Sequence, residues 1–216
     1  MKPMLLDLFC GAGGAAMGYY RAGFRVVGVD IEPQPHYPFD FVQGDAIEFL
    51  HAYSRRAVGQ RFAAFHASPP CQGYSKMNHV HKRDYPLLIE PVRDLLEPIG
   101  LPYVIENVEG APLKNPVTLC GTSFGLKVIR HRLFESNVTL KAPPCGSHKG
   151  EIYSPAGHGD PNWRNHAANP HLSGRGYTDR CRQAMGVDWM NRDELAESIP
   201  PAYTEYVGHQ LMEVLR

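Results

Sequence analysis

The sequence has no excess of charge of either sign, because 22 lysines and arginines are balanced by 22 aspartates and glutamates. Net charge therefore neither supports nor excludes a polyanionic partner, and any basic surface has to be local. No apolar run is long enough to cross a bilayer, and the chain begins at Met1 without the pattern of a signal peptide. We expect an intracellular protein that does not bind a membrane.

Cysteine is scarce as well. The cysteines are Cys10, Cys71, Cys120, Cys145 and Cys181. They are odd in number and too widely spaced for the disulfide framework of a secreted domain, which leaves room for a reactive thiol. Cys71 lies in the segment ASPPCQGYSKM, directly after Pro69 and Pro70, which stiffen the chain before it. This setting raises the question whether Cys71 is an apolar filler or a group held for chemistry.

Short apolar segments alternate with turns in the first half of the chain, as they do in α/β proteins. A glycine-rich turn leads from the first apolar segment to a helix of small residues, and a second apolar segment ends in an acid. This order predicts an α/β fold with a doubly wound, mostly parallel sheet, of the Rossmann-like kind. The expected strands lie at 4–9, 25–30, within 39–46, at 61–68 and at 103–107, and a helix covers much of 85–97.

The second half is less regular. Residues 143–176 are rich in Gly, Pro, His and Asn and have almost no apolar periodicity, which predicts a long ordered loop or small subdomain. Asn191 is an expected N-cap, and a last helix is expected to follow Pro200 and Pro201.

A candidate cofactor site follows from the ends of the first strands. Glycines after the first strand let the backbone approach a ligand closely, and an acid after the second strand is placed to accept hydrogen bonds from ribose hydroxyls. The turn lacks the Lys-Ser/Thr ending of a phosphate-binding loop, so S-adenosylmethionine is preferred over a nucleotide phosphate. The predicted cofactor residues are Phe9, Gly11, Gly13, Gly14, Asp30, Ile31, Asp45 and Pro69.

Four short motifs in order resemble the DNA cytosine-C5 methyltransferase family. DLFCGAGG is similar to the family's cofactor motif, PCQ (70–72) to its nucleophile motif, ENV (106–108) to its acid motif and RHR (130–132) to its arginine motif. The resemblance covers roughly residues 4–136. It implies an S-adenosylmethionine-dependent enzyme of the methyltransferase fold that acts on duplex DNA.

The resemblance also implies the catalytic roles. Cys71 would add to C6 of the cytosine, because C5 alone is not nucleophilic enough to take a methyl group from a sulfonium. Glu106 would act as an acid against N3 of the base. Arg132 would contact the base's carbonyl oxygen, and Arg130 would order the loop.

Contacts with DNA are expected from two loops, because the target base has to leave the duplex to reach such a pocket. The basic segment after the nucleophile would close over DNA phosphates, and the irregular segment would supply further contacts. The predicted nucleic-acid-binding residues are Ser75, Lys76, Lys82, Arg83, Arg164 and Arg175, with Lys149, Trp163 and Asn165 as further candidates.

The chain departs from the family pattern in its target-recognition region. Val128 stands where the arginine motif usually begins with glutamine, residues 141–182 are a shortened recognition segment, and residues 202–208 match the family's last motif poorly. We expect one methyltransferase domain over 1–216 with helices in 191–216, and the need for a partner that completes target recognition stays open. The small size suits a phage or mobile-element enzyme in the cytoplasm of a bacterium or infected host.

A metal site is not predicted. Cys145 and His148 have the spacing C-x-x-H, but the next histidines, at 158, 166 and 171, are irregularly spaced.

Alternatives to the predicted reaction remain. The segment SPPC is one residue from the SPPY motif of amino-methyltransferases, although a cysteine followed by Gln72, together with Glu106, favours C5 chemistry. A tRNA cytosine-C5 methyltransferase would share the same motifs. An enzyme that transfers another one-carbon group from a cofactor analogue, or a catalytically silent DNA-binding relative, also remains open.

Overall fold

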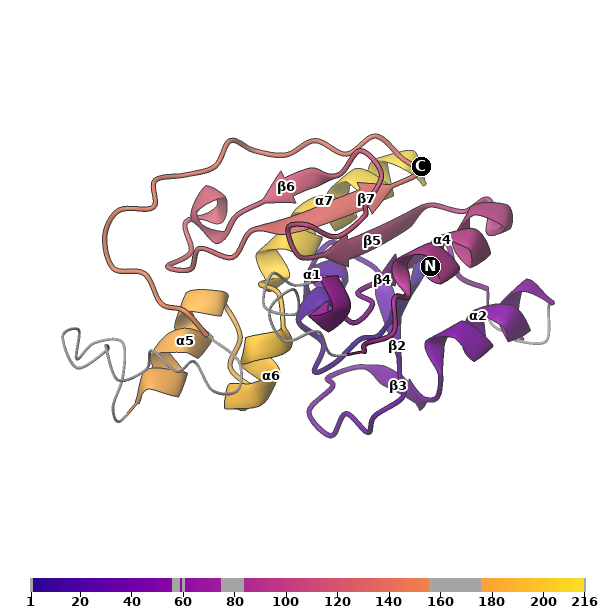
Figure 1. The fold of residues 1–216 in the computed structure, drawn as a ribbon, viewed down its shortest axis with the longest axis horizontal. Coiled ribbons are helices and arrows are strands. Elements are labelled where there is room, and N and C mark those ends of the chain that lie inside the picture. The colour runs from indigo at the N-terminus through magenta and orange to yellow at the C-terminus, as the bar shows by residue number, and fades with distance from the viewer. Residues whose placement is uncertain (1, 56–58, 60, 75–83, 156–175, 216) are drawn as a thin grey trace.

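The computed structural model describes residues 2–55, 59, 61–74, 84–155 and 176–215. Within this part of the chain seven strands form one sheet in the order β3-β2-β1-β4-β5-β7-β6 (Figure 1). The strands are β1 (Met4–Leu8), β2 (Arg25–Asp30), β3 (Asp40–Gln43), β4 (Ala64–Ala67), β5 (Tyr103–Asn107), β6 (Val117–Leu119) and β7 (Arg132–Ser136).

Strands β1 to β5 are parallel, and β7 runs antiparallel to both of its neighbours, β5 and β6. Strand β1 lies inside the sheet, with β2 and β3 on one side of it and β4, β5, β7 and β6 on the other. The carboxyl ends of β1 to β5 therefore share one edge of the sheet, where open α/β sheets bind their ligands.

Helices cover both faces of the sheet, and the strands alternate their apolar side chains between them. Leu5 and Val26 pack on the face with the first and last helices, whereas the next residues, Leu6 and Val27, pack on the opposite face. The helices are α1 (Gly14–Arg21), α2 (Ala46–Ser54), α4 (Ile89–Leu96), α5 (Tyr177–Met185), α6 (Arg192–Glu197) and α7 (Pro201–Val214), with short 3-10 turns η1 (Gln72–Tyr74), η2 (Glu97–Ile99) and η3 (Gly121–Phe124).

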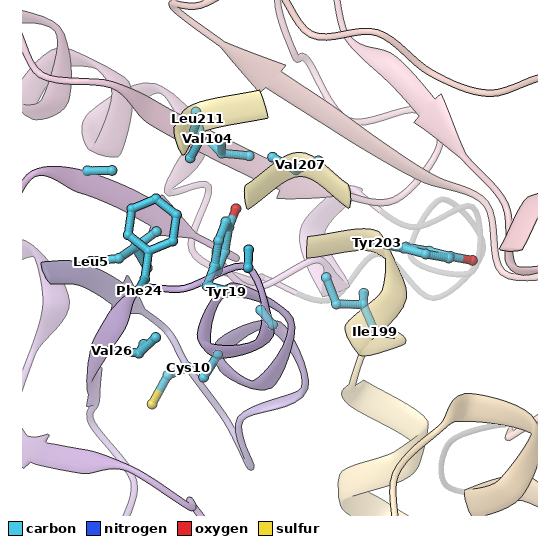
Figure 2. Close-up of a cluster of buried hydrophobic side chains, with 14 of the residues drawn as sticks. Leu5, Cys10, Tyr19, Phe24, Val26, Val104, Ile199, Tyr203, Val207 and Leu211 are labelled. Atoms are coloured by element: carbon cyan, nitrogen blue, oxygen red, sulfur yellow. The ribbon is translucent and has the colours of Figure 1, made fainter. Parts of the chain in front are cut away.

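The first face is covered by α1 and α7, which lie against each other (Figures 1 and 2). Figure 2 shows Tyr19 of α1 between the strand residues and Val207 of α7. The helices approach closely at Gly18, where a Cβ atom would lie 2.1 Å from the carbonyl oxygen of Pro201 and 2.1 Å from Oγ1 of Thr204. Any side chain at position 18 would therefore push α7 away from α1.

Helices α5 and α6 pack beside the sheet rather than on it, around a separate apolar cluster that includes Val128 and Met185. Asn191 caps α6, as predicted, and the structure shows that the cap is a capping box: its side chain accepts from the Asp193 and Glu194 N–H groups, and the Glu194 side chain accepts from the Asn191 N–H. The indole N–H of Trp189 donates to the carbonyl of Ala12 at 2.7 Å, which ties this cluster to the turn after β1.

The structure confirms the predicted fold class and most of the expected elements. The strands at 25–30 and 103–107 have the predicted bounds, and the predicted last helix is α7. The helix expected over 85–97 begins only at Ile89, and α2, β6, β7 and α5 were not predicted. No helix in the described ranges is long and apolar enough to cross a membrane.

Candidate active site

The candidate catalytic residues come from neighbouring strands in the sheet. Cys71 follows β4, Glu106 lies near the carboxyl end of β5, and Arg132 opens the adjacent antiparallel strand β7. Strand β5 pairs with both β4 and β7, so the three residues meet at one edge of the sheet. Cys71 and Arg132 are 61 positions apart in the sequence, and the pairing of β4, β5 and β7 brings them together.

The loop that carries Cys71 is held by backbone and amide hydrogen bonds. The Ser68 N–H donates to the Leu8 carbonyl at 3.1 Å, and the Asn107 side-chain N–H donates to the Pro69 carbonyl at 2.8 Å. After the thiol, the Tyr74 N–H donates to the Cys71 carbonyl at 3.0 Å and closes η1. The chain therefore presents Cys71 from a fixed turn, with its side chain partly exposed.

Glu106 and Arg132 form an ion pair inside the site. The Arg132 Nε atom lies 3.2 Å from Oε1 of Glu106, and the two side chains are only 18% and 8% exposed. Burial raises the pKa of Glu106 above its ordinary value, while the positive charges of Arg132 and Arg130 oppose that rise. Glu106 thus holds a proton more readily than an exposed glutamate does.

The same pair acts on the thiol. Burial raises the pKa of Cys71, Arg132 lowers it, and the carboxylate of Glu106 raises it again. The thiol form is therefore favoured in the protein as described. A loss of negative charge at Glu106 would favour the thiolate, because the positive charge of Arg132 would then act unopposed.

A chain of hydrogen bonds links buried Tyr19 and His66 to Glu106 through Ser68. The hydroxyl of Tyr19 lies 3.0 Å from Nδ1 of His66, and Nε2 of His66 lies 2.9 Å from Oγ of Ser68. The Ser68 hydroxyl in turn bonds to Glu106 and lowers its pKa. Burial lowers the pKa of His66 to about 3, so this imidazole is neutral.

The direction of this chain follows from the neutral imidazole, which has one donor and one acceptor nitrogen. Ser68 donates to Glu106 when that carboxyl is ionised, because the bond lowers the pKa of Glu106. In that state Nε2 of His66 donates to Ser68, and Nδ1 accepts from Tyr19. The chain therefore aims a hydroxyl donor at the carboxylate and fixes its orientation.

Arg130 points to another part of the fold. Its guanidinium donates to the Ser198 carbonyl, to the Leu195 carbonyl at 3.2 Å and to the Pro155 carbonyl at 2.6 Å. Burial lowers its pKa to about 10, and the charge of Arg132 acts in the same direction. Arg130 thus joins the end of α6 to the segment at Pro155, whereas Arg132, two residues on, turns to Glu106.

The predicted cofactor residues follow strands β1 to β4. The Gly11 N–H donates to Oδ2 of Asp30 at 2.9 Å, and the Glu32 N–H donates to Oδ1 of the same carboxylate at 3.0 Å. Phe9 and Gly11 have positive φ angles of 57° and 47°, and a Cβ atom at Gly11 would meet nothing within 4 Å. Asp30 thereby orders the turn after β1, and the backbone of Gly11 is open to a ligand.

The neighbouring glycines have packing reasons. A Cβ atom at Gly13 would lie 2.8 Å from Cδ of Pro38, and one at Gly14 would lie 2.0 Å from Oγ of Ser198. Gly13 also has a φ of 83° as the N-cap of α1. These two positions need glycine to close the fold around the turn, independently of a ligand.

The remaining predicted cofactor residues differ in setting. Asp45 caps α2, and its Oδ1 accepts from the Ile47 and Glu48 N–H groups at 2.7 and 3.0 Å. Ile31 is a large apolar side chain left 61% exposed directly after Asp30. These features fit an adenosine-containing cofactor: a fixed carboxylate for hydroxyl groups and an apolar side chain beside it for a flat base.

The six predicted nucleic-acid-binding residues lie outside the described residues, as do Trp163 and Asn165. Lys149 is described and exposed. The reasoning from sequence missed Tyr19, His66 and Ser68. The signal was small: His66 is a polar residue in an otherwise apolar strand, three positions before Pro69.

Solved structures of methyltransferases share this fold. A protein described as a DNA modification methyltransferase encoded within an E. coli prophage superposes with a TM-score of 0.65 at 15% identity, over 99% of both chains. The S. pombe Dnmt2 methyltransferase gives 0.63 at 14% identity over 100% of both chains. The Entamoeba histolytica methyltransferase EhMeth gives 0.61 at 11% identity, over 100% of this chain and 99% of its own. No family model and no curated protein matches the sequence. The likeness establishes the Rossmann-like methyltransferase fold.

Proposed function

We propose that the protein transfers a methyl group from S-adenosylmethionine to C5 of a cytosine in DNA, through a covalent bond between Cys71 and C6 of the base. The proposal rests chiefly on one observation. A partly exposed thiol lies at the carboxyl edge of the sheet, where its pKa responds to the charges of a buried Glu106 and a half-buried Arg132 that are 3.2 Å apart. A methyltransferase acting on an amino group has no use for such a thiol.

The reaction begins when the Cys71 thiol gives its proton to solvent and the resulting thiolate forms a bond to C6, which pushes electrons into the ring. Glu106 gives its proton to N3 and so neutralises the charge that develops there. C5 is then nucleophilic and takes the methyl group. A base removes the C5 proton, the S–C6 bond breaks, the thiolate leaves and the N3 proton returns to Glu106.

The pKa shifts suit these roles. Burial raises the pKa of Glu106, so this carboxyl holds the proton that the first step requires more readily than an exposed glutamate does, and burial also raises the pKa of the Cys71 thiol. Once Glu106 has given its proton to N3, its carboxylate is stabilised by the positive charge of Arg132, whose Nε lies 3.2 Å from Oε1. Arg132 also has donors to spare for the carbonyl oxygen of the base.

S-Adenosylmethionine, when bound, supplies an electrophilic methyl group and contains no phosphate. Asp30 would accept from its ribose hydroxyls, Ile31 would pack on the adenine, and the Gly11 backbone would line the turn. Asp45 would accept a hydrogen bond from the adenine amino group through Oδ2, because both of its helix-capping bonds are made by Oδ1. These residues lie along the same sheet edge as Cys71.

A double-stranded substrate would have to extrude the cytosine into the site. We include in the proposal that the basic segment after Cys71 and residues 141–182 contact the DNA, the latter as a shortened recognition segment. The comparison chain described as a DNA modification methyltransferase favours DNA as the substrate.

The test is nucleoside mass spectrometry after incubation with S-adenosylmethionine and mixed-sequence duplex DNA. We expect 5-methylcytosine from the wild type and none from Cys71→Ala. A second arm uses DNA with 5-fluorocytosine, in which C5 cannot lose a proton, so that the wild type stays covalently attached and shifts on a denaturing gel. Cys181→Ala, a change at a buried cysteine of the α5–α6 cluster, is the matched control and should retain both results.

The outcomes separate the alternatives. Methylation of tRNA but not DNA would move the substrate to RNA. N4-methylcytosine or N6-methyladenine that persists in Cys71→Ala would contradict the C5 mechanism. DNA binding that is equal in wild type and Cys71→Ala, without a product or an adduct from DNA or tRNA, would contradict the enzyme proposal as a whole.

A further inference from the structure

We propose that the chain holds one structural zinc ion on Cys120, His131, Cys145 and His148. One ligand atom from each of the four residues lies within 4.8 Å of every other. No part of the proposed reaction uses this cluster, so the metal site stands independently of the proposed function.

The distances between ligand atoms suit a tetrahedral ion. Nε2 of His148 lies 3.0 Å from Sγ of Cys145 and 3.4 Å from Sγ of Cys120. Nε2 of His131 lies 3.5 Å from Sγ of Cys145. With Zn–S bonds of about 2.3 Å and Zn–N bonds of about 2.0–2.1 Å, a tetrahedron separates its ligand atoms by about 3.3–3.8 Å. Small shifts of exposed side chains close the remaining difference.

The donor set selects the metal. Two thiolates and two imidazoles in a tetrahedral arrangement are typical of structural zinc, while Ca²⁺ and Mg²⁺ need oxygen ligands. On binding, each thiol loses its proton to solvent, because the thiolate is the ligand form. The protein would fill all four coordination positions of the ion, so none would be open to a substrate or a catalytic water.

The ligands come from three separate points of the chain. Cys120 directly follows β6, His131 directly precedes β7, and Cys145 and His148 belong to the segment beyond β7. Cys120 is buried, His131 is half-buried and the other two are exposed. A metal would therefore fasten the exposed segment to the end of the β6–β7 pair, as structural zinc fastens loops that have little apolar core.

The backbone around the cluster is built for close approach. A Cβ atom at Gly146 would lie 2.5 Å from the Thr122 carbonyl oxygen, so the C-x-x-H turn presses directly on the chain after Cys120. Oγ1 of Thr122 lies 3.2 Å from Sγ of Cys120 and is placed to hydrogen-bond a thiolate there. Pro143 and Pro144 precede Cys145 and restrict the approach of the turn.

A metal ion on His131 would also affect the position of Arg132, and this step of the proposal rests on the proposed function. His131 stands between Arg130 and Arg132, and its carbonyl accepts from Nη1 of Arg132 at 2.9 Å. A metal on the His131 ring would hold that carbonyl in place and so position the Arg132 guanidinium. Metal removal should then lower turnover without preventing the Cys71 adduct from forming.

The test measures metal first, without DNA or cofactor. Full-length protein, freed of any affinity tag, should contain about one zinc per chain by plasma mass spectrometry. Replacement by Co²⁺ should give the visible bands of a tetrahedral ion and a thiolate charge-transfer band. Cys145→Ser should weaken Co²⁺ binding by more than the roughly 10–100-fold lost with an outer-shell partner. Cys71→Ser, the matched change at a cysteine outside the cluster, should bind as the wild type does.

Melting temperatures measured with and without a chelator show whether Cys145→Ser is folded. A chelator should lower the melting temperature of the wild type but not that of Cys145→Ser, and the two should then coincide. Wild-type protein that neither contains zinc nor takes up Co²⁺ would overturn the proposal. So would Cys145→Ser that binds Co²⁺ as tightly as the wild type, or a Cys120–Cys145 disulfide in protein that takes up no metal.

Discussion

The Arg93–Glu135 ion pair allows a prediction whose size can be worked from the structure. Arg93 of α4 reaches Glu135 of β7 through two parallel bonds, Nε to Oε1 at 2.6 Å and Nη2 to Oε2 at 2.8 Å. The side chains are only 4% and 2% exposed. Glu135 also accepts the Lys114 N–H at 2.6 Å. We expect Arg93→Met to lower the free energy of unfolding by about 3–5 kcal/mol, because it leaves a buried carboxylate without its counter-charge.

An exposed pair supplies the matched control. Arg25 and Asp40 are 2.7 Å apart, but their side chains are 63% and 57% exposed. Arg25→Met should therefore cost about 0–1 kcal/mol. Both variants exchange an arginine for a methionine, so the difference reports burial and pairing rather than the residue types.

The double variant Arg93→Met/Glu135→Met separates pairing from burial. It removes both charges and leaves the Lys114 N–H without its acceptor, which costs about 1–3 kcal/mol. The double variant should therefore be more stable than Arg93→Met alone. The assay is urea unfolding followed by circular dichroism, with equal slopes required in all variants. A cost below about 1 kcal/mol for Arg93→Met would refute the reasoning. So would a cost of the double variant equal to the sum of the costs of the single variants Arg93→Met and Glu135→Met.

Three further predictions concern the site and its frame. Arg132→Gln removes the positive charge that lowers the pKa of Cys71, so that pKa should rise further and alkylation of the thiol by iodoacetamide should move to higher pH; an unchanged pH profile would contradict the pairing. Gly18→Ala should cost about 1–3 kcal/mol in thermal unfolding, because its Cβ would press on α7, while Gly44→Ala, with nothing within 4 Å, should cost less; equal costs would contradict the close packing. Asn191→Ala should cost about 0.5–2 kcal/mol through loss of the capping box, and full stability in urea would count against it.

The parts of the fold that could be predicted have local signals. Strands at 25–30 and 103–107 are continuous apolar runs, and Asn191 is followed three residues later by Glu194, which is the pattern of a capping box. Cys71 and Glu106 were predicted as site residues because short motifs in order carry them. These signals need no knowledge of tertiary contacts.

The parts that were missed depend on contacts between distant residues. Strand β7 is short and mixed in polarity, because it carries Arg132 and Glu135, which find their partners on β5 and α4. Cys120 and His131 lie 11 residues apart with no recognisable ligand spacing, and only the return of the chain at Cys145 brings them together. Asp45 shows the reverse case, in which a predicted ligand residue also has a helix-capping role.

The contact of α1 with α7 has a consequence for how the protein is made. The turn after β1 leaves the ribosome well before α7 does, and the helix behind that turn packs on residues about 190 positions later, as in the bond from Oγ1 of Thr204 to the Ala15 carbonyl. During synthesis the apolar side of α1 is therefore exposed to solvent until α7 has left the ribosome. The turn after β1 should therefore gain its final packing only once α7 has emerged and folded against α1.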